Sequence, residues 1–216
     1  MTVNYNPGIV TSGLILCLDS NNPRSYPGSG PSWFDISGNN NNFTLNGTLT
    51  HSNTEGFSGF TQTNRWFRNN FPSNLKTSQG GSGLTTCVWA RCTGVGGWQK
   101  LIGNGDDQNY IDLYAFSGSG LYHQEDGSTL YYNDGINVGN DTLYMADSIW
   151  RMYCSTNMNS GTLTNPTDAF GIGSEGDAQY NYPWIGNIMA VMIYNRVLST
   201  TELTQNFNAY RGRFGI

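Results

Sequence analysis

Residues 186–212 read GNIMAVMIYNRVLSTTELTQNFNAYRG, and this stretch contains a strand followed by a helix. Its first part, GNIMAVMIY, is apolar at both odd and even positions. Such a strand suits the centre of a sheet that is covered on both faces. The second part begins with Ser199 and Glu202 at the spacing of a capping box, which predicts a helix start. A central strand joined to one short helix is the pattern that decides the fold.

The predicted helix has one apolar face. Leu203, Phe207 and Tyr210 follow one another at helical spacing, so they would share the face that docks on the sheet. Leu198, before the cap, is placed to pack on Leu203 as a hydrophobic staple. Gly212 is the residue type that commonly ends a helix, so we expect the helix to stop there.

The rest of the chain alternates with period two in short segments separated by turn residues. Seven segments show the pattern: GLILCLD (13–19), TTCVWAR (85–91), NYIDLYAF (109–116), GLYHQ (120–124), STLYYNDG (128–135), SIWRMYCST (148–156) and DAFGIG (168–173). Many short strands joined by polar turns are typical of an all-β sandwich. No repeat or break in composition marks a second domain, so we expect one domain over residues 1–216.

Composition narrows the classes of partner. Charged residues make up only 12% of the 216, and the net charge is −5. The few basic residues form no stripe, which argues against nucleic acid as a partner. The start, MTVNYNPGIV, lacks the basic and apolar regions of a signal peptide. No apolar run reaches the roughly 20 residues that a membrane-spanning helix needs, so we expect no membrane partner.

The four cysteines, Cys17, Cys87, Cys92 and Cys154, each lie in a predicted strand. They form no CxxC pair, and no histidine lies at ligand spacing, so a zinc site is not expected. The favoured interpretation is four small buried side chains. A disulfide is the alternative.

Residues 20–47, SNNPRSYPGSGPSWFDISGNNNNFTLNG, are rich in turn formers but carry an apolar centre. Trp33 would anchor the loop on the sandwich. Asp35 and Ser37 are residue types that bond nearby backbone amides. The stretch therefore predicts an ordered structural loop and not a linker or a catalytic loop.

Three segments together resemble a known family. The first is N-terminal and contains Leu18-Asp19, followed by NPRSYPGSG and Trp33–Asn39. The second, in the middle of the chain, comprises the strands LTTCVWARC and SIWRMYCST. The third is the C-terminal strand with its capped helix and RFGI tail. The chain resembles the laminin-G-like, concanavalin A-like jelly-roll domains of tailed (cyanophage-type) bacteriophage virions. The resemblance implies a jelly-roll β-sandwich with one short C-terminal helix, located in the virion. It departs at residues 56–70, because no carboxylate lies between Glu55 and Asp106. A metal or ligand role that the family has there is therefore not implied.

Catalysis is not expected. Glycosidases with this sandwich use a Glu-x-Asp-x-Glu or Glu-x-Asp-x-x-Glu strand, whose glutamates serve as nucleophile and acid/base. Here Glu175-Gly176-Asp177 begins that motif, but Gln179 and Tyr180 stand where the second glutamate must be. His51 and His123 are the candidate general bases, and both are interpreted as ordinary histidines.

Calcium is the one metal worth testing. Four loop carboxylates at one end of the sandwich could supply oxygen ligands: Asp106, Asp107, Asp126 and Asp134. They lack DxDxDG spacing, and aspartate is a common turn residue. We therefore expect no cofactor, with Ca²⁺ as the alternative.

Aromatic residues supply the candidate binding surface. The candidates for a glycan platform or a protein interface are Trp66, Trp98, Tyr131, Tyr132, Tyr182 and Trp184. Tyrosine and tryptophan are enriched at protein interfaces and also fill cores, and the sequence favours interface or core over sugar.

Taken with the family resemblance, the sequence predicts a non-enzymatic virion structural protein. It would serve as a capsid decoration or appendage subunit, bind other virion proteins and form a homo-oligomer. The alternative is a carbohydrate-binding adhesin that recognises host-surface glycans. An extracellular enzyme accessory module is less favoured because no signal peptide is seen.

Overall fold

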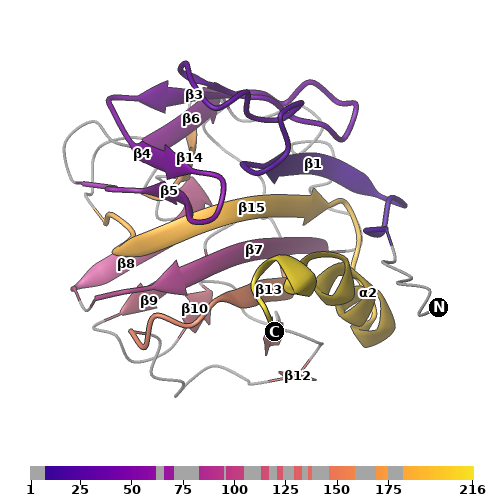
Figure 1. Ribbon diagram of the computed structural model, residues 1–216. Coiled ribbons are helices and arrows are strands. Elements are labelled where there is room, and N and C mark those ends of the chain that lie inside the picture. Colours follow the sequence, from indigo (N-terminus) through magenta and orange to yellow (C-terminus); the bar gives the residue numbers. More distant parts are fainter. Residues whose placement is uncertain are drawn as a thin grey trace.

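The structure is a computed structural model, and it describes residues 8–61, 66–70, 83–94, 96–104, 113–116, 121–123, 129–132, 136–137, 146–158, 169–174 and 182–216. In these residues two antiparallel sheets form a sandwich, and a helix covers part of the outer face of one sheet (Figure 1). The predicted all-β fold with one short C-terminal helix is confirmed.

Among the described residues the first sheet has eight strands. In spatial order they are β12 (Ile136–Asn137), β11 (Thr129–Tyr132), β13 (Arg151–Met158), β7 (Leu84–Cys92), β15 (Gly186–Tyr194), β5 (Gly56–Ser58) and β4 (Thr50–Ser52), and β1 (Leu14–Asp19) also pairs with β15. The second sheet contains, in order, β10 (Leu121–His123), β9 (Leu113–Phe116), β8 (Trp98–Asn104), β14 (Ala169–Ile172), β6 (Trp66–Asn70), β3 (Phe43–Asn46) and β2 (Ser32–Trp33).

Strand β15 lies at the centre of the first sheet, as its two apolar faces predict. Val191 and Ile193 belong to the core between the sheets. Met192 and Tyr194 belong to a second cluster on the outer face, together with residues of the helix. The strand is therefore buried on both sides, which explains why it shows no polar face.

Helix α2 (Thr200–Tyr210) begins with the predicted capping box. The Ser199 hydroxyl accepts from the backbone N–H of Glu202 (3.4 Å), and the Glu202 carboxylate accepts from the Ser199 N–H (2.9 Å). The expected stop near Gly212 is confirmed for the α-helix, which ends at Tyr210 with Arg211 as its C-cap, and the chain then continues through a 3₁₀ turn, η1 (Arg211–Arg213). Arg213 donates to both carboxylate oxygens of buried Asp19 (2.9 and 2.8 Å), so this turn is held against β1.

Asp35 is the central acceptor of the loop before β3. Its carboxylate accepts from the backbone N–H groups of Cys17 (2.9 Å), Ser37 (2.9 Å) and Asn41 (3.0 Å), and from the Ser37 hydroxyl (2.8 Å). Trp33 is fully buried against two phenylalanine rings of the core. Both residues therefore have the structural role predicted for them.

The favoured interpretation, that all four cysteines are unpaired buried side chains, is wrong for two of them. Cys87 on β7 and Cys154 on β13 lie directly opposite each other and form a disulfide. Cys17 and Cys92 are buried free thiols, as expected. The period-two pattern shows which face a cysteine occupies but not which residue faces it on the next strand, so the pairing required the sheet register.

Candidate functional site

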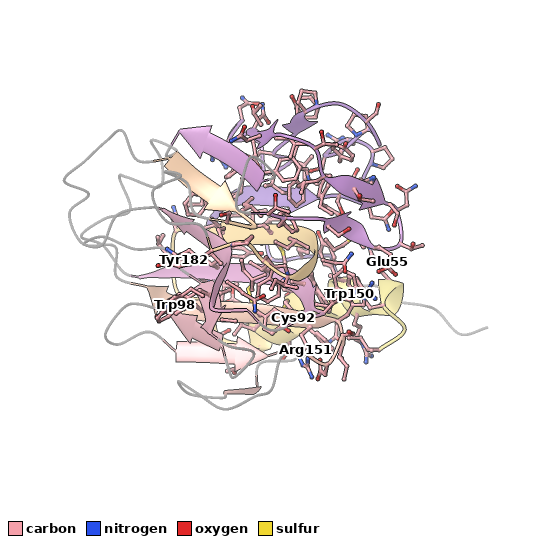
Figure 2. The ribbon with its side chains drawn as sticks, turned by 90° about the vertical axis from the view of Figure 1, so that its left-hand side faces the viewer. Glu55, Cys92, Trp98, Trp150, Arg151 and Tyr182 are labelled. Atoms are coloured by element: carbon pink, nitrogen blue, oxygen red, sulfur yellow. A yellow bond between two sulfur atoms is a disulfide. The ribbon has the colours of Figure 1, made fainter. Side chains whose placement is uncertain are left out.

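A hollow of about 280 Å³ lies at the start of β8, beside the segment that leads into β15. It is lined by Gly96, Gly97, Trp98, Gln99, Tyr182, Pro183 and Ile185. Trp98 is 43% exposed, and its ring centroid lies 6.3 Å from that of Tyr182. Figure 2 shows the two aromatic side chains close together at the left of the view.

The aromatic walls are held by β8 and its neighbours. Successive residues of a strand point to opposite faces, so Trp98 lies on the outer face of the second sheet while Gln99 points inward. Trp98 packs edge to face on Tyr114 of β9 at 5.1 Å. The Lys100 N–H donates to the Tyr182 carbonyl (2.8 Å), and the Lys100 ammonium lies 5.9 Å from the Tyr182 ring centroid. These contacts keep both rings at the hollow.

Gln99 connects the two backbone segments that form the hollow. Its side chain is buried, its carbonyl accepts from the Ile185 N–H (3.0 Å), and its amide donates to the Gly94 carbonyl (3.3 Å). Ile185 lies over Gly94 and Gly96, where an added β-carbon would come within 2.7 and 2.9 Å of its side chain. The sequence showed no signal for Gln99, because a single uncharged residue within a strand has no distinctive pattern.

The aromatic candidates have different outcomes. Trp98 and Tyr182 lie together at the hollow. Trp184 is wrong as a surface candidate: its ring is fully buried between the sheets, and its indole N–H donates to the Arg91 carbonyl (3.2 Å). The structure describes the backbones of Trp66 in β6 and of Tyr131 and Tyr132 in β11, but not the positions of their side chains. Their binding roles stay predictions.

The calcium candidates Asp106, Asp107, Asp126 and Asp134 lie outside the described residues. Within the described ranges, no three His, Cys, Asp or Glu side chains gather as metal ligands would. The same part of the chain contains no helix long and apolar enough to cross a membrane.

The two free thiols are held in their neutral form. Burial raises the pKa of Cys17 to about 12, and the carboxylates of Asp19 and Asp35 add to the effect. Burial also raises the pKa of Cys92, against the opposing influence of a backbone hydrogen bond from Gly94. Because the thiolate is the reactive species, neither side chain is poised as a nucleophile at neutral pH.

No protein-family model and no curated protein matches the chain. Similar solved structures include Trypanosoma rangeli sialidase in complex with the inhibitor DANA, with a TM-score of 0.59 and 12% identity over 94% of this chain and 35% of that one. The receptor-binding domain of botulinum neurotoxin mosaic serotype C/D matches with a TM-score of 0.59 and 12% identity, over 92% of this chain and 51% of that one. The binding domain of Paraclostridial Mosquitocidal Protein 1 matches with a TM-score of 0.52 and 16% identity, over 92% and 52%.

These likenesses confirm the jelly-roll β-sandwich. At such low identity they show the fold alone. The chain spans about a third of the sialidase and about half of each toxin structure. None of the three is a virion protein, so the expected virion role rests on the sequence resemblance.

Proposed function

We propose that this chain is a carbohydrate-binding domain and that the hollow at Trp98 and Tyr182 is its sugar site. The observation that carries the proposal is a large, 43% exposed indole placed beside a second aromatic ring in a formed hollow. Such rings offer an apolar face to the C–H groups of a pyranose together with a polar edge. A volume of about 280 Å³ is at the small end for ligand sites, which fits one sugar ring.

The backbone beside the rings supplies polar groups. Gly97 has no side chain, and a β-carbon added there would have no atom beyond the adjacent residues within 4 Å. A ligand can therefore approach the main chain closely at this residue. The buried amide of Gln99 is already used to join Gly94 and Ile185. Sugar hydroxyls would therefore bond to backbone groups of the glycine segment, while the two rings cover the apolar face.

The similar structures support binding more than a role in the virion shell. One is a receptor-binding domain, one is a binding domain, and the sialidase structure is a complex with an inhibitor. We propose binding without catalysis, because the chain spans only about a third of the sialidase and lacks the second glutamate of the glycosidase motif.

A glycan array compared across variants tests the site. We expect saturable binding by the wild type and a loss of at least about tenfold in Trp98→Ala and Tyr182→Ala, because burying an aromatic side chain contributes on the order of 1.5–3 kcal/mol. Phe34→Ala is the matched control, since Phe34 is 40% exposed on a different loop. Wild-type binding that survives both variants would place the sugar elsewhere, and binding to no glycan would reject the proposal.

A second candidate function is the virion structural role, with the protein located in the virion and acting through contacts with other virion proteins and with copies of itself. The resemblance of the N-terminal loop and the C-terminal tail to phage virion domains favours it. Mass spectrometry of purified particles tests it: hundreds of copies indicate shell decoration, and a few copies indicate a tail or fibre. Absence from the particles rejects this role and leaves the sugar-binding proposal intact.

A further inference from the structure

The end of the sandwich that carries the hollow also carries a fixed Arg–Glu pair. Arg91, near the end of β7, pairs through Nη2 with the Oε2 of Glu55, and its Nε donates to the Asn187 side-chain carbonyl (3.0 Å). The Asn187 amide donates to the Glu55 backbone carbonyl (3.0 Å), and Asn187 is only 7% exposed. The Arg91 guanidinium also lies 5.4 Å from the ring centroid of Trp150. The pair is therefore held in place by a buried amide and an indole.

This pair has hydrogen-bonding capacity left. The side chains of Arg91 and Glu55 are 26% and 43% exposed. Within the described part of the chain, Arg91 Nη1 and Glu55 Oε1 have no further partner. A donor and an acceptor thus lie side by side at the surface. Two neighbouring hydroxyls of a sugar match them, since one can accept from the guanidinium while the other donates to the carboxylate.

The pair and the hollow lie at the same end of the sandwich, the pair on the outer face of the first sheet and the hollow on that of the second. Ile185, which lines the hollow, accepts from the Thr93 N–H (2.9 Å), and the next two residues pair across the strands as Gly186 with Cys92 and Asn187 with Arg91. Adjacent strand residues are about 3.3 Å apart, so the backbone at the start of β15 links the two places, and a ligand that touches both must cross this end of the sandwich from one face to the other. In Figure 2, Trp98 and Tyr182 lie in one half of the view, Glu55 and Trp150 in the other, and Cys92 between them.

We propose that the sugar site extends from the hollow across this end of the sandwich to the Arg91–Glu55 pair, so that the ligand is an oligosaccharide and not a single sugar. One sugar ring occupies the hollow, and a later unit of the same chain bonds to the pair. The inference rests on the proposed function for the class of ligand. It adds the length of the ligand and a second contact that the sequence did not suggest.

The test uses an array that carries mono- to hexasaccharide members of hexose and N-acetylhexosamine series. The key variant is Arg91→Met/Glu55→Gln, which removes donor and carboxylate together and leaves no unpaired charge. We expect the wild type to bind longer members more tightly, and the double variant to bind them about tenfold more weakly, since hydrogen bonds to charged groups are the stronger class. Binding of the monosaccharide should not change. Trp98→Ala should weaken binding at every length, and Phe34→Ala at none.

The outcomes separate the two proposals. If no spot of any length binds the wild type, the proposed function fails and this inference fails with it. If binding does not depend on chain length, or if the double variant binds long members as well as the wild type does, only the extended site is overturned. Glu55→Gln alone keeps the Arg91–Asn187 bond, and it serves as the test if the double variant does not fold by circular dichroism.

Discussion

Asp35 shows how much one side chain contributes to the N-terminal loop. Four donors converge on its carboxylate, three of them backbone N–H groups from β1 and from the loop itself. We expect Asp35→Ala to lower the free energy of unfolding by about 2–4 kcal/mol, because buried donors lose their acceptor. Urea unfolding measures the change. Arg24→Ala, at an exposed position of the same loop, should stay within about 0.5 kcal/mol of the wild type. A comparably small loss for Asp35→Ala would contradict this role.

Single residues differed in how well the sequence predicted them. Trp33 and Asp35 were predictable because turn chemistry is local: proline, glycine and aspartate act on residues a few positions away. Trp184 was not, because its burial depends on the second sheet passing over it. Arg91 and Glu55 were not singled out at all, since they are 36 positions apart and only the pairing of β5 and β7 with β15 brings them together.

The stability of the fold should depend on pH through Glu202, which caps helix α2. The Arg196 guanidinium, and next the Ser199 N–H, lower the pKa of Glu202 from 4.5 to about 2. Because the folded-state pKa is the lower one, the ionised carboxylate contributes its full stability above pH 4.5 and loses it as the pH falls through about 2. We expect the difference in melting temperature between wild type and Glu202→Gln to shrink from pH 6 to pH 2. A difference that stays constant over this range would contradict the assignment.

The disulfide between β7 and β13 predicts how many thiols of the protein are free. The Cys87–Cys154 disulfide closes a loop with a sequence separation of 67, and loop-closure entropy then stabilises the fold by about 4 kcal/mol. Alkylation in denaturant should label two thiols, Cys17 and Cys92, without reductant and all four after reduction. Reduction should also lower the melting temperature. Four labelled thiols in the unreduced, air-oxidised protein would show that the bridge does not form.

The sequence predicted several of the strands and the helix, but it did not predict which strands pair with each other. Alternation predicted β1, β7 and β13 because a sheet face imposes period two on a strand, and β15 was predicted from its continuous apolar run. It left the register open, and a register is what places one cysteine opposite another. The helix was predicted from its cap and from Gly212 near its end, but the 3₁₀ turn that follows it and the ion pair between Arg213 and Asp19 were not predicted.

The whole domain should be stable without metal. In the described residues the interior is apolar, and the loop carboxylate Asp35 is occupied by hydrogen bonds. We expect EDTA to leave the melting temperature unchanged, and added Ca²⁺ to leave it unchanged as well. A clear drop with EDTA that Ca²⁺ restores would identify a site, with Asp106, Asp107, Asp126 and Asp134 as the first residues to substitute.

The burial of the indoles has an optical consequence. Trp33, Trp89 and Trp184 have no exposed surface, whereas Trp98 is 43% exposed. Indoles shielded from water fluoresce at shorter wavelengths than indoles in contact with it. A sugar that covers Trp98 would therefore alter the long-wavelength edge of the emission spectrum, while the light from the three interior indoles stays constant. The protein carries its own spectroscopic reporter, and affinity can be followed by titration without a dye.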